Sequence, residues 1–226
     1  MPRARTSKQA SRQTAATSNG SGCLSLYSLP LFAVLLIACL ITVLSLNMPI
    51  ASSASSQTDS AGLSPIFTRE VQYWADDILR WADASSLDPN LVAVILQLES
   101  CGNPFARSGV GAVGLFQVMP SHFKSDENPY NPNTNALRGL NYLAHSLDAS
   151  HGNVRLALAG YNGGIGVITR GEWTWSVETL RYVYYGAPIY EDSRSGVTSS
   201  PTLEEWYRKY GVGLCRQASK KLGLKP

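Results

Sequence analysis

A single carboxylic acid, Glu99, closes an otherwise mostly apolar run of the chain, Leu-Val-Ala-Val-Ile-Leu-Gln-Leu-Glu over residues 91–99. A carboxyl group among apolar neighbours is costly to ionise, so we expect a raised pKa and a proton on this group near neutral pH. A carboxyl group of this kind can act as a general acid. On this pattern alone, the alternative is a glutamate at the end of a helix that points into solvent.

Four short polar and glycine-containing segments begin at Glu99 and follow one another along the chain. The first reads Glu-Ser-Cys-Gly-Asn-Pro from residue 99, with Ser108 shortly behind it, and the second reads Gly-Leu-Phe-Gln-Val-Met-Pro from residue 114. The third reads Ala-Leu-Ala-Gly-Tyr-Asn-Gly-Gly from residue 157, and the fourth reads Glu-Thr-Leu-Arg-Tyr-Val from residue 178. In this order the segments resemble the signature of the soluble lytic transglycosylase family, over roughly residues 87–190.

The resemblance implies a lysozyme-like helical domain that cleaves the glycan strands of peptidoglycan, with Glu99 as the catalytic residue. It also implies a set of substrate-binding positions. Among these, Tyr161 should contact the catalytic carboxyl. The expected substrate-binding residues are Ser100, Ser108, Phe116, Gln117, Tyr161, Asn162 and Tyr182. From the residue types alone, a loop-capping serine, a core tyrosine and a turn asparagine are the structural alternatives for Ser108, Tyr161 and Asn162.

Three positions depart from the family pattern. Phe116 stands where methionine is usual, and Gly160 and Gly163 replace the alanines on either side of the Tyr-Asn pair. We expect phenylalanine to keep an apolar but stiffer groove wall, and the glycines to weaken the helix around Tyr161.

The mechanism that the resemblance implies uses one glutamate twice. Glu99 would protonate the glycosidic oxygen between N-acetylmuramic acid and N-acetylglucosamine, and then deprotonate the C6 hydroxyl that closes a 1,6-anhydro ring. No metal or cofactor is required. One rival is a hydrolase of the goose-type lysozyme kind, with Glu178 as a possible second carboxylate that holds water. Another is a catalytically inactive protein that only binds the wall.

The N-terminal part of the chain reads as a membrane anchor. Residues 24–46 form an apolar segment without a charged side chain, long enough to approach a bilayer span, and the four basic residues before it favour a cytoplasmic location for residues 1–23. Residues 47–64, rich in Ser and Ala, read as a linker, and residues 65–226 as the catalytic domain. Two alternatives stay open: a lipoprotein box ending at Cys39, and signal-peptide cleavage near Ala51 to Ala54. All three place the domain in the bacterial cell envelope, outside the cytoplasm.

The charge distribution gives no indication of nucleic-acid binding. Of 19 basic residues, Arg3, Arg5, Lys8 and Arg12 precede the apolar segment, which leaves 15 basic against 16 acidic residues, or a charge of −1, for the rest of the chain. The resemblance implies glycan strands as a partner, and the apolar N-terminal segment implies the membrane.

Two of the four cysteines, Cys101 and Cys215, lie outside the anchor segment and its flank. An oxidising compartment would allow them to form a disulfide, although two separate thiols are equally compatible with the sequence.

The elements that must position these residues are predicted to be helices, since no alternating strand pattern occurs. Phe67, Val71, Trp74, Ile78 and Trp81 recur with helical spacing, and a central helix should begin behind Asp88-Pro89 and end at residues 101–104. Leu137, Leu140, Leu143 and Leu147 form a stripe on the next helix. Further helices are predicted over residues 154–159, halted by Gly160 and Gly163-Gly164, and over residues 177–185 and 203–221.

Overall fold

The computed structural model describes residues 62–225, which fold as a mainly helical domain. In chain order, the helices are α2 (Arg69–Gln72), α3 (Ala75–Ser85), α4 (Pro89–Ser100), η1 (Pro120–His122), α5 (Pro132–Ala149), α6 (Val154–Gly163), η2 (Ile165–Val167), η3 (Glu172–Thr174), α7 (Val177–Arg194), α8 (Pro201–Trp206), η4 (Tyr207–Gly211) and α9 (Val212–Leu222). In the described part of the chain, β structure is limited to isolated bridges that join Val113 to Arg107 and Val118. The prediction of a mainly α domain is confirmed.

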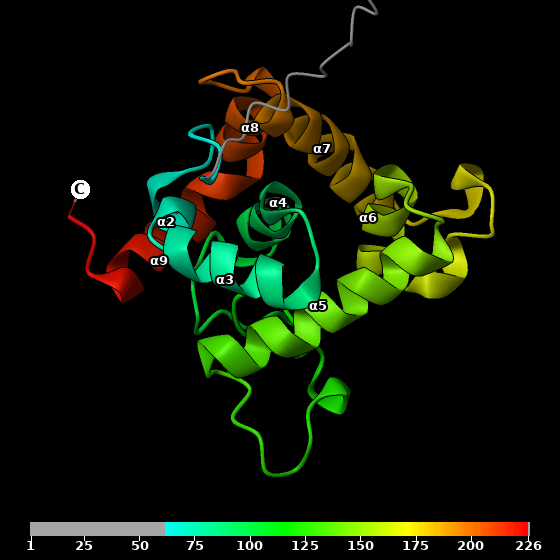
Figure 1. Cartoon of the computed structure of the whole chain (residues 1–226), viewed down its shortest axis with the longest axis horizontal. Helices are drawn as coiled ribbons and strands as arrows, with labels where there is room; N and C mark the ends of the chain where they lie inside the picture. The colour runs from blue at the N-terminus through cyan, green and yellow to red at the C-terminus, as the bar shows by residue number, and fades with distance from the viewer. Residues whose placement is uncertain (1–61, 226) are drawn as a thin grey trace, which may run out of the picture. The chain divides into compact units, whose positions relative to one another are not determined.

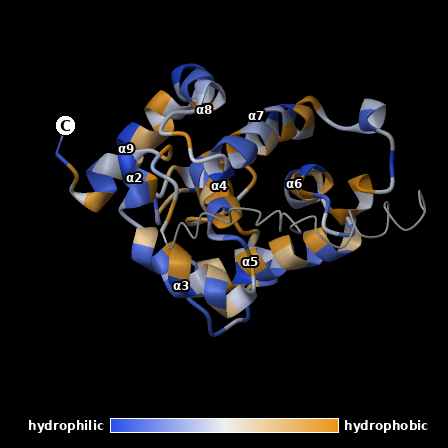
Figure 2. Ribbon diagram, turned by 45° about the horizontal axis from the view of Figure 1, so that its top comes forward, coloured by the Kyte–Doolittle hydropathy of each residue, from blue (hydrophilic) through white to orange (hydrophobic). Residues whose placement is uncertain are grey.

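Helix α4 lies in the middle of the domain, and α2, α3, α7 and α9 pack around it (Figure 1). Its residues from Leu91 to Gln97 are all buried, whereas the surrounding helices carry both hydrophobic and hydrophilic residues (Figure 2). The Asp88 side chain accepts a hydrogen bond from the backbone N–H of Asn90, and Pro89 occupies the first turn. An N-cap followed by proline is a favoured helix start, and the sequence predicted it here.

The single amphipathic helix expected from Phe67 to Trp81 is instead two helices. Helix α2 ends at Gln72, α3 begins at Ala75, and Phe67 precedes both. All five apolar residues of the pattern are nevertheless buried. The spacing predicted which side chains face the core, but it did not predict the break between the two helices at Trp74.

The buried face of α5 differs from the predicted leucine stripe. Leu140 and Leu143 are buried, but Leu137 is 51% exposed. The positions that face the core include Ala136, Gly139 and Ser146. These small residues allow close packing, and apolar periodicity alone does not detect them because two of them are not strongly hydrophobic.

Gly160 does not halt α6, which continues to Gly163 and ends at the predicted Gly163-Gly164 pair. A Cβ atom at Gly160 would lie 2.3 Å from Ser146 Oγ and 2.6 Å from Ile168 Cδ1. The glycine therefore allows α6 to approach α5 closely, and this packing outweighs its low helix propensity.

The C-terminal prediction was also too simple. Helix α7 runs on to Arg194, and the next helical stretch begins at Pro201 and passes through the π turn η4. Between residues 62 and 225, no helix combines the length and apolar character needed to cross a bilayer. The predicted anchor, residues 24–46, and most of the linker lie outside the described residues.

Candidate active site

Glu99 lies one residue before the end of α4 and lines a cavity of about 260 Å³. The cavity gathers residues from all four sequence segments and from the C-terminal helices. Its other lining residues are Leu98, Ser108, Gln117, Asn162, Glu178, Arg181, Tyr182, Tyr185, Trp206, Tyr210 and Leu214. Five predicted site residues besides Glu99 therefore meet here: Ser108, Gln117, Asn162, Glu178 and Tyr182.

Burial raises the pKa of the Glu99 carboxyl to about 8, and the negative charge of Glu178 acts in the same direction. The Tyr182 hydroxyl opposes both, because hydrogen bonding to the ionised carboxyl lowers the pKa. Glu99 is only partly covered, so the carboxyl combines an apolar surrounding with access to the cavity. A carboxyl with a pKa near 8 holds its proton at neutral pH and can donate it to a bound substrate.

Tyr182, rather than Tyr161, presents its hydroxyl to Glu99. The Tyr182 hydroxyl is buried and, among residues 62–225, has no hydrogen-bond partner of normal geometry. The Tyr161 hydroxyl instead donates to the Phe116 carbonyl oxygen at 2.8 Å. The expected contact between Tyr161 and the carboxyl stays a prediction, and the Glu99 charge raises the pKa of Tyr161.

Asn162 is held in place by Thr179, a residue that the sequence analysis did not single out. The Thr179 hydroxyl, 1% exposed, donates to Asn162 Oδ1 at 3.0 Å. Thr179 is in turn fixed by Ser176, the N-cap of α7, whose Oγ accepts the Thr179 backbone N–H at 3.0 Å. The signal that could have found this pair is the capping serine three residues before a threonine inside the fourth segment.

Gly163 makes this arrangement possible. A Cβ atom there would lie 2.7 Å from Thr179 Oγ1, so a larger residue would push α7 away from α6. The departure from alanine at this position thus has a packing explanation.

A second missed residue, Asn135, holds the loop that carries Gln117. The Asn135 side chain is 1% exposed, accepts the Phe116 backbone N–H at 2.8 Å, and donates to the carbonyl oxygens of Val113 and Pro129 at 2.9 Å each. Gly114, with φ of +77°, leaves room for it, since a Cβ there would lie 2.3 Å from Asn135 Nδ2. No nearby motif distinguishes Asn135 from an ordinary residue of the first helical turns of α5.

Two expected substrate-binding side chains are inaccessible to substrate. Ser100 is fully buried, with its Oγ donating to the Leu115 carbonyl oxygen at 2.7 Å and accepting the Gly102 N–H at 3.1 Å. Phe116 is also fully buried, and its ring packs edge-on against Trp81 rather than forming a groove wall. Both side chains lie in the core next to the loops around Glu99 and do not line the cavity.

A smaller cavity of about 160 Å³ adjoins the first, because Gln117 and Asn162 line both. Tyr161 and His122 line this second cavity, so Tyr161 lies beside the Glu99 cavity and not in its wall. A larger hollow of about 980 Å³ at Ile66, Leu203 and Leu224 contains none of the predicted site residues.

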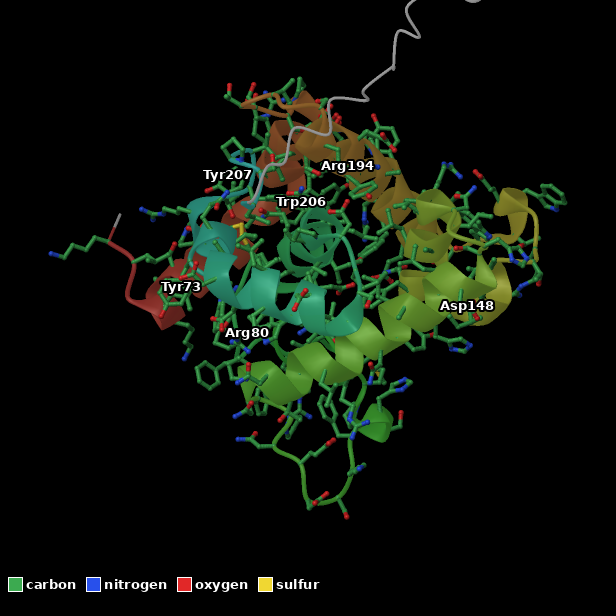
Figure 3. The ribbon with its side chains drawn as sticks, viewed as in Figure 1. Tyr73, Arg80, Asp148, Arg194, Trp206 and Tyr207 are labelled. Atoms are coloured by element: carbon green, nitrogen blue, oxygen red, sulfur yellow. A yellow bond between two sulfur atoms is a disulfide. The ribbon has the colours of Figure 1, made fainter. Side chains whose placement is uncertain are left out.

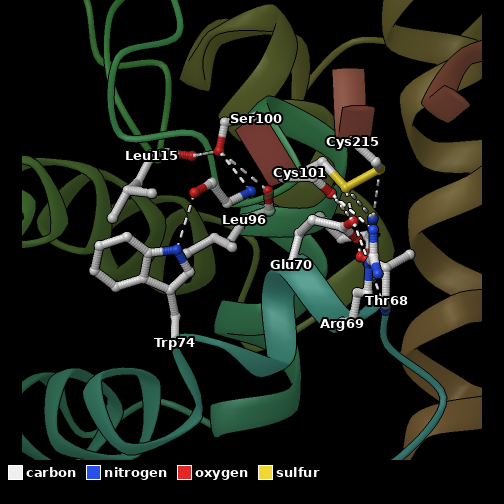
Figure 4. Close-up of a disulfide and its surroundings, with 12 residues drawn as sticks. Thr68, Arg69, Glu70, Trp74, Leu96, Ser100, Cys101, Leu115 and Cys215 are labelled. Atoms are coloured by element: carbon white, nitrogen blue, oxygen red, sulfur yellow. Dashed lines mark hydrogen bonds and ion pairs between the residues drawn. A yellow bond between two sulfur atoms is a disulfide. The ribbon is translucent and has the colours of Figure 1, made fainter. Parts of the chain in front are cut away.

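Cys101 and Cys215 form a disulfide with their Cα atoms 5.0 Å apart (Figure 4). Cys101 adopts a left-handed conformation, with φ of 51°, as the C-cap of α4, so the bridge joins the end of the helix that carries Glu99 to α9. Glu70 is the only acidic neighbour in a potential metal cluster with these two sulfurs among the described residues. Because both sulfurs are bonded to each other, this cluster is not suited to hold a metal.

Comparison with known proteins assigns a family to part of the chain. Residues 76–174 match the family described as the transglycosylase SLT domain. This part of the chain is therefore a domain of the soluble lytic transglycosylase family. The match includes Glu99, Gln117 and Asn162 but ends before α7.

Two similar proteins carry transglycosylase names. A "Transglycosylase" of Enterobacteria phage PRD1 is 40% identical over 115 residues, which covers 50% of this chain and 40% of the phage protein. A "Membrane-bound lytic murein transglycosylase E" of Buchnera aphidicola is 31% identical over 87 residues, 33% of this chain and 39% of that protein. The chain thus spans about two fifths of the length of either relative.

Among solved structures, an inactive mutant of the lytic transglycosylase Slt from Pseudomonas aeruginosa is similar at 22% sequence identity. The similarity has a TM-score of 0.40 and covers 66% of this chain and 24% of that one.

Proposed function

We propose that this protein is a peptidoglycan lytic transglycosylase in which Glu99 acts first as a general acid and then as a general base. The observation that carries the proposal is a carboxyl with its pKa raised to about 8, open to a cavity lined by polar residues of the family signature. The SLT domain match supports the choice of glycan strands as substrate.

In this mechanism the protonated Glu99 gives its proton to the glycosidic oxygen as the bond between N-acetylmuramic acid and N-acetylglucosamine breaks. The resulting carboxylate takes the proton of the C6 hydroxyl on the same N-acetylmuramic acid, and O6 bonds to the anomeric carbon. The Tyr182 hydroxyl suits the first step, because it stabilises the ionised form of Glu99 that proton donation leaves behind. Attack by a hydroxyl of the same sugar needs no positioned water.

Activity against purified sacculi tests the proposal. We expect residues 62–226 to release soluble fragments and Glu99→Gln to release none, because an amide of the same shape cannot exchange a proton. Circular dichroism serves as the control for folding. Full activity of the Glu99→Gln variant would rule out Glu99 as the catalytic acid.

One observation favours a second candidate function, hydrolysis. Glu178 lines the same cavity as Glu99 and is exposed at the first turn of α7, where it could hold a water molecule. Glu178→Gln distinguishes the two, since a two-carboxylate hydrolase would lose nearly all activity and a transglycosylase would not.

We also propose that residues 24–46 anchor the domain to the membrane with the catalytic domain outside the cytoplasm. The apolar run and the preceding basic residues support this proposal. Sedimentation of the full-length chain with membranes, and its absence from them after deletion of residues 1–61, would test it.

A further inference from the structure

One wall of the Glu99 cavity comes from a part of the chain that the family match does not reach. The match ends at residue 174, whereas Trp206, Tyr210 and Leu214 belong to α8, η4 and α9. The disulfide pins this wall, because Cys215 directly follows Leu214 and is bonded to Cys101 beside the catalytic helix end. The wall is thus a fixed part of the cavity.

A π turn gives the wall its local shape. Helix η4 (Tyr207–Gly211) is a π-helical turn, a rare form that is often found at functional sites. Gly211 accommodates the Trp206 ring, since a Cβ atom there would lie 2.7 Å from Trp206 Cζ3 (Trp206 is labelled in Figure 3). Tyr210, within this turn, is 47% exposed although it lines the cavity.

Arg181 of α7 lies over the Tyr210 ring, with its guanidinium carbon 4.9 Å from the ring centroid. Tyr185 supports the ring from its edge, with 5.7 Å between centroids. The cation–π contact orients the guanidinium while leaving its N–H groups able to donate hydrogen bonds.

Within the part of the chain that the structure describes, the charge of Arg181 is not neutralised by an ion pair. None of the salt bridges found in residues 62–225 involves Arg181, although Glu178 lies one helical turn earlier and lines the same cavity. An exposed guanidinium that is held in place at a binding cavity is well suited to bind a carboxylate through two parallel hydrogen bonds.

We propose that Arg181, supported by Tyr210, forms a subsite for a carboxylate of the peptide stem carried by N-acetylmuramic acid. This inference rests on the proposed function, since it concerns the peptide part of the same peptidoglycan substrate. It implies that the protein prefers peptide-bearing glycan strands to strands without peptides. Arg181 would then determine specificity, while Glu99 performs the chemistry.

The test compares two substrates, purified sacculi and the same glycan strands after enzymatic removal of the peptides. Turnover is measured with the wild-type protein and binding with a Glu99→Gln background, which should not cleave the strands. We expect Arg181→Gln to reduce the preference for peptide-bearing strands about tenfold in both assays. Tyr210→Ala should also reduce it, and Tyr210→Phe should retain it, because the ring and not the hydroxyl supports Arg181.

Arg194→Gln is the matched control. Arg194, labelled in Figure 3, is on the same helix. It lies over the ring of Tyr190 at 5.5 Å, but it does not line the Glu99 cavity. We expect this variant to keep the wild-type preference.

Failure of the Arg181 subsite and failure of the proposed function give different results. Suppose that the wild type cleaves strands but Arg181→Gln leaves the preference unchanged, or lowers cleavage and binding of both substrates equally. The subsite is then wrong and the proposed function stands. If the wild type cleaves neither substrate, the proposed function is wrong. The binding assay then still decides whether Arg181 recognises the peptide, because the same tenfold loss of preference for peptide-bearing strands is expected there.

Discussion

At the scale of single residues, the environment of Glu99 is a balance between groups that raise and lower its pKa. Burial and the Glu178 charge raise it, and the Tyr182 hydroxyl lowers it. A general acid must be protonated to begin the reaction, so activity should fall as pH rises through the pKa near 8.

This balance predicts opposite shifts for two substitutions. Tyr182→Phe removes the group that favours the ionised carboxyl, so the alkaline limb of kcat/KM should move to higher pH. Glu178→Gln removes a like charge, so the same limb should move to lower pH. The quantity to measure is the pH at which kcat/KM falls to half its maximum, since either variant can also change the maximum itself. Shifts in the same direction would contradict the described site.

Glu99 should also make folding stability depend on pH. Its carboxyl has an ordinary pKa of 4.5 when unfolded and about 8 when folded, so between these values the unfolded state releases a proton that the folded state keeps. Stability is therefore lost as pH rises from about 4.5 to 8. At pH 7 we expect Glu99→Gln to be more stable than the wild type by on the order of 3 kcal/mol. Urea unfolding at several pH values measures this, and a difference independent of pH would contradict it.

Residue types predicted which residues gather at the cavity better than they predicted individual contacts. Glu99, Gln117 and Asn162 were found from short motifs and do meet at one cavity. Ser100 and Phe116 share the same motifs but face away from it, because neighbouring residues in a motif point in different directions. Thr179 donates a hydrogen bond to Asn162, and the capping serine marks the threonine in the sequence without revealing which distant residue it contacts.

At the scale of helices, the contact between α6 and α7 positions Asn162. Gly163→Ala would place a Cβ atom 2.7 Å from Thr179 Oγ1 and should disturb the bond between Thr179 and Asn162. We expect a loss of about 1–3 kcal/mol in unfolding free energy, together with reduced activity.

Gly213→Ala is the control for this prediction. Gly213 lies inside α9, and a Cβ atom there would meet nothing within 4 Å. Alanine is the better helix former, so this variant should be more stable by about 0.5–1 kcal/mol. Equal effects of the two substitutions on thermal unfolding would show that packing between α6 and α7 does not require glycine.

Helix existence was predictable, but helix faces and ends were less so. The start of α4 followed from Asp88 and Pro89, because capping is local in sequence. Leu137, Gly160 and the break at Trp74 were misjudged, since each depends on which neighbouring helix approaches and how closely. Tertiary packing outweighs local propensity at these positions.

At the scale of the whole domain, the disulfide ties its first third to its last helix. Cys101 and Cys215 are separated by 114 positions in the chain, so the bridge restricts a long loop in the unfolded state. Loop-closure entropy predicts a stabilisation of about 4–5 kcal/mol. We expect the doubly substituted Cys101→Ser, Cys215→Ser variant to unfold at a clearly lower urea concentration than the oxidised wild type. Coincident unfolding curves would contradict a structural role.

The central claim, that Glu99 directs an internal attack by the substrate's own C6 hydroxyl, is tested most directly by the products. Mass spectrometry of fragments released from sacculi by residues 62–226 distinguishes 1,6-anhydro ends from reducing ends, since the anhydro form is lighter by one water. We predict anhydro ends from the wild type and no fragments from Glu99→Gln. Reducing ends in the wild-type digest, with activity lost equally in Glu99→Gln and Glu178→Gln, would instead establish a two-carboxylate hydrolase.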